Sequence, residues 1–499
     1  MFHYLPWILS QLVQPFNLVL MIAGTIVGII FGAIPGLSGT MAVMLFMPLT
    51  YTMQSSTAII FLLSLWIGGC SGAFIGSVLL GIPGSASAVA TCWDGHPMAQ
   101  KGQASKALAI GMTASFFGTF FSAVIGGIAA EKVADFAFAM GSWEYTALCL
   151  VAMTMVLAIS KGNMFKGLAS TCIGFLLASV GFSPIDAEPR FVFGNMYLMG
   201  GLGMIVVLTG IFAVSHILVT FGKGFSQPPE VTKEGLKGVG LTGKDIASEL
   251  PNIIRSFLIG LGIGFLPGMG SGLSNLVAYS SAKNAAKHPE EYGHGAPGGI
   301  WAPEVANNAA IGGAMIPMAA LGIPGDSTTA LLIGALTIHG LEMGPMVFKN
   351  SGDVVYLMFV TVAVVAVLVF AIQALTKRWF PYILKVPNWY MYPALLIICL
   401  ASAYVDSGNL YKCGMMMVFC VVGVLMELGG LPASPLILAF ILAPIMEKNM
   451  LTAFQNTNTW TTFFTRPVSC VLMLIAIFCV FSPIFRGLWE KKKAGKPAK

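Results

Sequence analysis

The sequence has 499 residues, of which 57% are hydrophobic and only 9% are charged, and its formal net charge is +6. Soluble domains carry roughly 25% charged residues, so water is excluded as the main solvent of this chain. The positive charge lies largely in loops and at the C-terminus, which favours membrane topology over nucleic-acid binding.

Long stretches without Asp, Glu, Lys or Arg recur along the chain. They cover residues 1–93, 107–130, 191–222, 256–282, 354–376 and 467–485. Each is long enough to cross the roughly 30 Å hydrocarbon layer as a helix. Lipid offers no partners to backbone groups, and barrel strands would alternate in polarity. The sequence therefore predicts an all-α polytopic membrane protein with roughly 10 to 14 membrane segments.

Three sequence patterns recur in the same order in the two halves of the chain. GIIFGAIPG at 28–36 matches GLGIGFLPG at 260–268, and GAFIGSVLLGIPG at 72–84 matches GAMIPMAALGIPG at 313–325. In the third pattern, Trp143, Gly162 and Asn163 match Trp389, Gly408 and Asn409 at equal spacing. Shortly after them, Pro184 matches Pro432. Transporters often contain such internal repeats.

The expected organisation is a first repeat over 1–221, a connector over 222–250, a second repeat over 251–485 and a basic tail over 486–499. The connector is the most polar stretch, and the tail holds five lysines, so both are expected in the cytoplasm. In the first half, the Lys and Arg content of successive loops places them inside, outside, inside and outside the cell. In the second half, the order of the loops is outside, then inside. The two repeats are therefore predicted to be inverted.

Each repeat contains two Pro-Gly pairs within apolar sequence. Proline lacks an N–H group and glycine tolerates unusual backbone shapes, so a helix breaks there and its freed backbone groups need partners. Four such breaks in repeat register predict broken or re-entrant helices around a shared central site. The alternative is a set of kinked helices that pack through glycine.

Small polar residues follow each break and begin the next helix. A helix N-terminus presents free N–H groups and the positive end of its dipole, which suits a carboxylate without a fixed positive charge. Opposite helix ends and free carbonyls at the same breaks would suit Na⁺. The predicted substrate-binding residues at the breaks are Pro35, Gly36, Ser38, Gly39, Gly84, Ser85, Ser87, Gly268, Gly270, Ser271, Gly325, Ser327 and Thr328.

The stretch APEVANNAAIGG adds amide and carboxylate side chains. Asn307 and Asn308 are candidates for hydrogen bonds to the substrate. Carboxylates within a membrane are costly and usually functional, so Glu304 and Asp326 are candidates for binding a coupling cation, Na⁺ or H⁺. Glu304 could instead cap a helix that begins after Pro303.

Other titratable residues give weaker patterns. His96 and His339 lie near the ends of corresponding segments, where a proton-linked role is open and a plain interfacial histidine is the simpler interpretation. The nine cysteines form no CxxC pair or Cys/His cluster at metal spacing. No cofactor and no metal beyond Na⁺ is expected.

Several motifs resemble the large membrane subunit of the tripartite tricarboxylate transporter family over nearly the whole chain. They are GxxPGLSG, GIPGSAS, WDGHPMAQKGQASKA, APEVANNAAIGGAMIP, LGIPGD and LPASPLILAFILAPIMEKNM. The resemblance implies a secondary transporter of the bacterial inner membrane, driven by Na⁺ or H⁺, for citrate or related di- and tricarboxylates. It also implies two partners, a small four-helix membrane subunit and a periplasmic solute-binding protein.

Two other classes of protein compete with a carrier. A passive anion channel would not require helix breaks around a closed midplane site. A membrane-embedded enzyme could use the acids and histidines above, but no nucleophile-plus-base pattern or metal motif supports it. Substrate counterflow separates a carrier from a channel.

Overall fold

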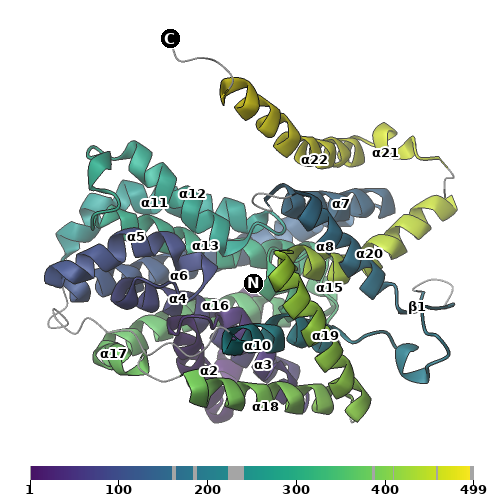
Figure 1. Ribbon diagram of the computed structural model, residues 1–499, viewed down its shortest axis with the longest axis horizontal. Helices are drawn as coiled ribbons and strands as arrows, with labels where there is room; N and C mark the ends of the chain where they lie inside the picture. Colours follow the sequence, from purple (N-terminus) through teal and green to yellow (C-terminus); the bar gives the residue numbers. More distant parts are fainter. Residues whose placement is uncertain are drawn as a thin grey trace. The chain divides into compact units, whose positions relative to one another are not determined.

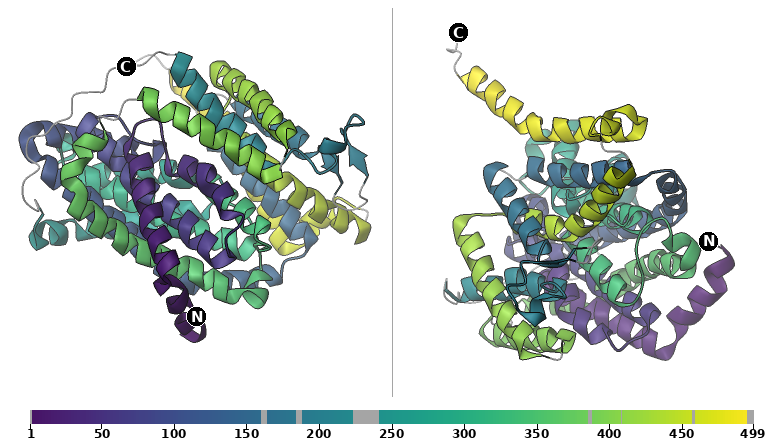
Figure 2. Two further views of the ribbon diagram at one scale, coloured as in Figure 1. Left: turned by 90° about the horizontal axis from the view of Figure 1, so that it is seen from below. Right: turned by 90° about the vertical axis from the view of Figure 1, so that its right-hand side faces the viewer.

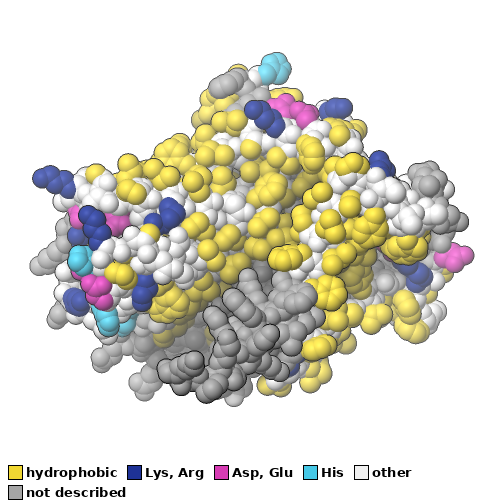
Figure 3. All heavy atoms as spheres, turned by 90° about the horizontal axis from the view of Figure 1, so that it is seen from above, with side chains coloured by type: hydrophobic (Ala, Val, Ile, Leu, Met, Phe, Trp, Pro, Cys, Tyr) yellow, Lys and Arg dark blue, Asp and Glu magenta, His cyan; other side chains and the backbone are white. Residues whose placement is uncertain are grey.

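A computed structural model describes residues 2–159, 164–183, 188–222, 241–384, 388–407, 409–456 and 459–494. Within these residues the regular secondary structure is helical apart from two strands of two residues each. Seven helical segments are long and apolar enough to cross a membrane, and shorter apolar helices accompany them. On the face drawn in Figure 3, hydrophobic side chains predominate. The predicted all-α polytopic membrane protein is therefore confirmed.

The chain divides into two compact units. The first unit comprises Met1–Asp135 and Ile217–Asn409, and the second comprises Phe136–His216 and Leu410–Lys499. Each unit thus takes chain from both of the repeats expected from the sequence. The repeat boundaries and the inverted orientation of the second repeat stay predictions.

The first unit contains the four Pro-Gly pairs and most of the long helices (Figure 1). Its elements are η1 (Phe2–Tyr4), α1 (Leu5–Val13), α2 (Pro15–Ala33), α3 (Gly39–Phe46), η2 (Met47–Thr50), α4 (Ser55–Leu80), η3 (Ala86–Ala88), α5 (Val89–Met98), η4 (Ala99–Gln103), α6 (Ala104–Phe138), α11 (Gly243–Phe265), α12 (Gly270–Ala285), η7 (Pro289–Glu291), α13 (Gly298–Leu321), α14 (Ser327–Ile338), α15 (Val347–Asn350), α16 (Gly352–Thr376), η8 (Lys377–Trp379), α17 (Phe380–Ile383) and α18 (Asn388–Ser407). The end of α6 and the helix α10 (Ser215–Gly222) run across the boundary between the units.

The second unit is built around α7, which lies beside α20 and α22, while α8 lies beside α20 (Figure 2). Its elements are α7 (Ser142–Ile159), α8 (Met164–Ala178), β1 (Gly181–Phe182), β2 (Pro189–Arg190), η5 (Met196–Leu198), α9 (Met204–Leu208), η6 (Thr209–Val214), α19 (Leu410–Gly429), α20 (Ala433–Asn456), α21 (Thr462–Thr465) and α22 (Pro467–Ala494). The two strands are antiparallel, with Gly181 opposite Arg190.

Among the residues that the structure describes, two ion pairs and an aromatic cluster join elements of the second unit. Arg190 contacts the Glu447 carboxylate of α20 with both terminal nitrogens, at 2.5 and 3.1 Å. Arg466 reaches Glu144 of α7 at 2.8 Å. Trp143, a member of the third sequence match, is buried against Phe463. This tryptophan therefore has a packing role in the first copy of the pattern.

Some sequence expectations fall outside the described residues. These are residues 223–240 of the connector, residues 495–499 of the tail, and Gly162, Asn163, Pro184 and Gly408 of the third match. The described part of the connector is helical from Gly243, because Thr242 and Asp245 form a capping box that starts α11.

Small residues let the helices of the first unit touch through their backbones. Gly28 and Gly32 of α2 lie against the α4 backbone at Leu65 and Gly69. In the same way, Gly264 of α11 lies against α13 at Ala310, and α11, α12 and α13 run side by side (Figure 1). In lipid, helices associate through such close packing of small residues. The repeated Gly-xxx-Gly spacing thus marks two equivalent helix contacts.

Gly264→Leu is expected to destabilise the protein, because a Cβ at this position would lie 2.7 Å from the Cα of Ala310. Overpacking of this kind costs at least about 2 kcal/mol, with backbone shift. Gly262→Leu is the matched control, since a Cβ at Gly262, two residues away, meets nothing within 4 Å. Thermal unfolding of the purified chain in detergent measures both variants; equal melting temperatures would contradict this account of the contact.

Candidate functional site

Each of the four Pro-Gly pairs lies between two helices. The first break (residues 34–38) joins α2 to α3, and the second (82–85) joins α4 to η3 and α5. The third break (266–269) joins α11 to α12, and the fourth (323–326) joins α13 to α14. The helix breaks expected from the sequence are therefore present at all four pairs.

The first and third breaks share one backbone shape. Gly36 and Gly268 both adopt the left-handed region, with φ of 88° and 79°. Ser38 then caps α3, because its Oγ accepts a hydrogen bond from the Met41 N–H at 3.2 Å. Gly39 is the first residue of α3, and Gly270 and Ser271 are the first two of α12.

The fourth break ends in a strong N-cap. The Asp326 carboxylate accepts from the Thr329 N–H at 2.8 Å, while the Thr329 hydroxyl accepts from the Asp326 N–H at 2.8 Å. Ser327 and Thr328 begin α14 directly after it. In the second break the corresponding residue is Ser85, whose hydroxyl bonds that of Ser87 at 2.7 Å. The two copies therefore differ by one carboxylate at matching positions.

The breaks of the second half contact each other and the start of α3. The Gly268 N–H donates to the Gly325 carbonyl oxygen at 2.8 Å, which joins the third break to the fourth. The hydroxyls of Thr40 and Thr328 are 2.5 Å apart, which joins the starts of α3 and α14. Segments almost 290 residues apart along the sequence are thus hydrogen-bonded at their helix starts.

Two further contacts bring the second break to the end of α2 and the start of η3 to the start of α12. Gly84 of the second break lies against the carbonyl oxygen of Gly32, so closely that no side chain fits at this position. A Cβ on Gly272 of α12 would lie 3.6 Å from that of Ala86, so the third break also lies near the second. We call the four breaks, together with the helix ends beside them, the break cluster. It brings together the break residues predicted for the substrate site, and most of their polar side chains are partly exposed.

Asn308 of α13 is fully buried and fully hydrogen-bonded. Its Oδ1 accepts from the hydroxyls of Ser71 at 2.8 Å and Thr119 at 3.1 Å. Its Nδ2 donates to the Ser115 hydroxyl and to the Glu304 carbonyl oxygen, both at 3.0 Å. The side chain therefore ties α13 to α4 and α6, and its direct contact with a substrate stays a prediction.

Glu304 and Asn307 are equally buried but keep unpartnered atoms. Glu304 Oε1 accepts from the Thr91 hydroxyl of α5 at 2.5 Å, whereas Oε2 and both polar atoms of the Asn307 amide lack a partner in the described chain. The alternative that Glu304 caps a helix is wrong, because α13 begins at Gly298 and Glu304 lies inside it. Thr91 was missed in the sequence because a threonine in an apolar helix gives no signal.

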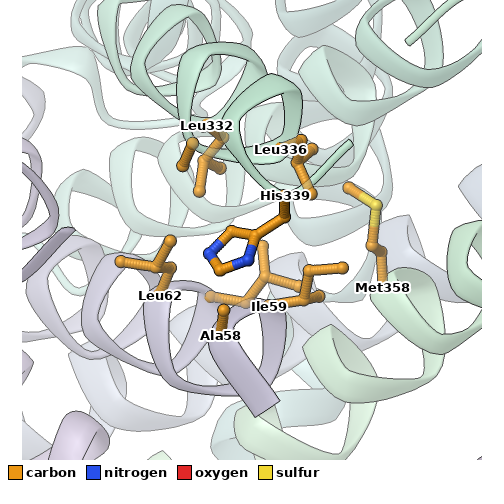
Figure 4. A pocket seen from close by; sticks show the side chains of 9 residues that line it. Ala58, Ile59, Leu62, Leu332, Leu336, His339 and Met358 are labelled. Carbon is orange, nitrogen blue, oxygen red and sulfur yellow. The ribbon is translucent and has the colours of Figure 1, made fainter. Parts of the chain in front are cut away.

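The two histidines tie helix ends to their neighbours. His96 Nδ1 lies 3.2 Å from the Val78 carbonyl oxygen, and His339 Nε2 lies 3.2 Å from the Thr50 hydroxyl. Figure 4 shows the His339 ring in a small apolar pocket beside Leu62 of α4 and Met358 of α16. This placement agrees with a structural role, and a proton-linked role stays untested.

Asp94 of α5 is a residue that the sequence analysis passed over. Its Oδ1 accepts from the N–H groups of Gly293, Gly295 and Ala296 at 2.8 to 2.9 Å, and its Oδ2 accepts from the Tyr279 hydroxyl at 2.8 Å. Successive N–H groups of this kind form a nest that binds anions. Two features of the sequence could have indicated this contact: the aspartate in WDGHP, and the glycine-rich stretch GHGAPGG, which can present successive N–H groups. Asp94 thus anchors α5 to the loop between α12 and α13.

Comparison with known proteins gives a family and two relatives. Residues 18–438 match the model of the tripartite tricarboxylate transporter TctA family. An uncharacterized 52.8 kDa protein in the TAR-I ttuC' 3' region of Agrobacterium vitis is 29% identical over 96% of this chain and 95% of its own length. An uncharacterized protein in the TAR-II ttuC' 3' region of the same organism is 29% identical over 46% of this chain and 96% of its own length. No solved structure matches the chain.

Asp94→Ala is expected to lower the free energy of unfolding by at least about 2 kcal/mol, because the buried N–H donors lose the carboxylate that accepted their hydrogen bonds. Asp94→Asn keeps one acceptor oxygen and should lose less. Chemical denaturation in detergent compares the two variants with the parent chain. If both variants unfold like the parent, the nest does not anchor α5.

Proposed function

This chain belongs to the tripartite tricarboxylate transporter TctA family, and we propose that it imports di- and tricarboxylates by cation-coupled secondary transport. The observation that carries this proposal is the break cluster, where backbone groups and hydroxyls from both halves of the sequence converge. Discontinuous helices that meet within the membrane are the usual setting for substrate and ion sites in secondary transporters.

The substrate carboxylates would bind at the helix starts of the break cluster. The helices α3, α12 and α14 all begin there, so the positive ends of three helix dipoles converge. Ser38, Ser271 and Ser327 offer hydroxyl donors that remain partly exposed. Such a site binds an anion through peptide groups and hydroxyls rather than through a fixed cation. A carrier can release a solute that is held in this way.

The coupling cation, Na⁺ or H⁺, would bind at Glu304 or Asp326. Asp326 stands where the other copy has Ser85, so its negative charge belongs to one side of the cluster only. Its carboxylate already stabilises the N-terminus of α14. Glu304 lies deeper, beside Asn307, which is the amide best placed to add a hydrogen bond to a bound solute because its polar atoms are free of protein partners.

The membership of a tripartite family supports partners beyond this chain. We propose a small four-helix membrane subunit and a periplasmic solute-binding protein that delivers the carboxylate. The protein would reside in the inner membrane of a bacterium, with the lysine-rich C-terminus in the cytoplasm under the positive-inside rule.

Asn307→Ala is expected to abolish uptake, because it removes buried polar atoms that the protein leaves without partners. The measurement is counterflow of labelled citrate in proteoliposomes that contain the chain with its partner subunits. Asn350→Ala, at the exposed end of α15, is the control and should transport normally. Normal counterflow by a correctly inserted Asn307→Ala protein would remove this residue from the site.

Gly325→Leu is expected to abolish counterflow as well, for a different reason. A Cβ at this position would lie 2.6 Å from that of Ala314 and 2.8 Å from the Gly264 carbonyl oxygen, so the third and fourth breaks could not meet. Membrane insertion, measured by fluorescence-detected size-exclusion chromatography, should persist. Full transport by this variant would show that the contact between breaks is dispensable.

A further inference from the structure

Glu304 is a carboxyl group sealed inside the first unit without a charged partner. Its side chain is 0% exposed. Among the residues that the structure describes, no Lys, Arg or His forms an ion pair with it; the described pairs involve other acids. An ionised carboxylate in such a place costs several kcal/mol, and a group in this position usually becomes neutral instead. The neutral, protonated form of the side chain therefore fits the conformation seen here better than the ionised form.

The neighbouring hydrogen bonds fit a protonated acid. Thr91 donates its hydroxyl hydrogen to Oε1, which leaves Oε2 as the oxygen that carries the proton. Oε2 and Asn307 Oδ1 make no hydrogen bond of good geometry, although the Asn307 side chain, one helical turn further along α13, lies close enough to interact with the Glu304 carboxyl group. A proton on Oε2 would be a hydrogen-bond donor, and Asn307 Oδ1 is an acceptor without a partner on the same helix, so one proton would satisfy both atoms after a small movement of the side chains. Each would otherwise cost about 1 to 3 kcal/mol.

A sodium ion fits these surroundings less well than a proton. Na⁺ is coordinated in transporters by unwound backbone carbonyls and helix ends, whereas Glu304 lies in the continuous part of α13. The carbonyl oxygen of Glu304 accepts the Asn308 amide and the helical bonds of α13 occupy its neighbours. The unpartnered atoms of this pair of residues are two oxygens, Glu304 Oε2 and Asn307 Oδ1, and the amide nitrogen of Asn307, which is a donor and cannot coordinate a cation.

Thr91 links Glu304 to the second break. It is the third residue of α5, and Ser85 and Ser87 lie just before this helix. The Ala90 N–H beside it donates to Asn275 Oδ1 of α12 at 2.9 Å, so this end of α5 is held by contacts from α12 and α13. A change at Glu304 thereby reaches residues of the break cluster through one hydrogen bond.

We propose that Glu304 carries the coupling proton of the transport cycle, and that Thr91 transmits its protonation state to the arm formed by η3 and α5. This deepens the proposed function, on which it rests, because it assigns the coupling ion and its site. Protonated Glu304 accepts Thr91 and holds the arm against α13. Loss of the proton to water leaves a buried charge. Thr91 donates more strongly to this carboxylate, but one hydrogen bond does not replace hydration, so the arm moves and water enters.

Several titratable groups on the elements packed against α13 have other hydrogen-bond partners, and two are thiols. Cys70 of α4 and Cys92 of α5 are the thiols nearest to Glu304. Asp94 of α5 and Tyr279 of α12 bond each other, and Asp326 caps α14. Glu249 and Arg255 of α11 both bond Asn252. These groups leave Glu304 as the buried acid with a free oxygen.

The test compares driving forces in proteoliposomes that contain the chain with its partner subunits, with labelled citrate as the probe. Wild-type protein should accumulate citrate under an inward proton gradient at equal Na⁺. Glu304→Gln, a neutral mimic of the protonated acid, should lose gradient-driven accumulation by at least about tenfold more than it loses counterflow. Glu342→Gln, at an exposed loop position, is the matched control and should keep both activities.

Thr91 is tested as a positioning residue by the pH profile of counterflow. Thr91→Val removes a donor that favours the ionised carboxylate, so the profile should move toward higher pH, by about one unit. Thr91→Ser should restore the wild-type profile. An unchanged profile in Thr91→Val would remove Thr91 from the coupling.

Three outcomes overturn the assignment of Glu304 and are distinguishable from a failure of the proposed function. Accumulation by Glu304→Gln under a proton gradient excludes it as the proton carrier. Loss of counterflow in folded Glu304→Gln makes it a binding or structural residue. Wild-type accumulation that follows a Na⁺ gradient alone excludes a coupling proton, while cation-coupled import stands. Absence of wild-type counterflow would instead overturn the proposed function.

Discussion

The structure of the first unit depends on one constraint: peptide groups freed by a Pro-Gly pair must find partners where lipid offers none. The third and fourth breaks satisfy it with each other, through the bond from Gly268 to Gly325. Caps at Ser38 and Asp326 satisfy the helix starts that follow. Since the breaks must touch, the helices that carry them approach to backbone contact, and only glycine fits at Gly84 and Gly325. The packing of the unit follows from the chemistry of its breaks.

Buried polar side chains then fall into two groups with opposite consequences. Asn308 and Asp94 each make a full set of hydrogen bonds. Those of Asn308 fix α13 to α4 and α6, and those of Asp94 fix α5 to the loop between α12 and α13. Glu304 and Asn307 are as deeply buried, yet they keep atoms without partners. A buried polar group with all of its hydrogen bonds fixes the helices around it. One without them destabilises the folded state, and a bound proton or solute can recover that free energy. The two kinds stand next to each other on one helix.

The sequence predicted the breaks well because each depends on neighbouring residues. The Pro-Gly pairs, the serine and aspartate caps and the glycine spacing are all local patterns. The structure has a helix break at each of the four Pro-Gly pairs and a cap at Ser38 and at Asp326. The two asparagines looked equivalent in APEVANNAA, but the structure separates them, because adjacent residues on a helix face different neighbours. The capping interpretation of Glu304 failed because Pro303 is accommodated inside α13, which had already begun at Gly298.

The sequence by itself determined the solvent of this chain, its helical class and the places where its helices break, since apolar length and backbone chemistry act within a few residues. Only the tertiary structure decided which breaks touch, and which buried acid has hydrogen-bond partners for both of its oxygens. Asp94 finds its partners 185 to 202 positions further along the chain, and Glu304 finds Thr91 at a separation of 213. Contacts of this kind depend on how distant helices pack, which no local pattern in the sequence records.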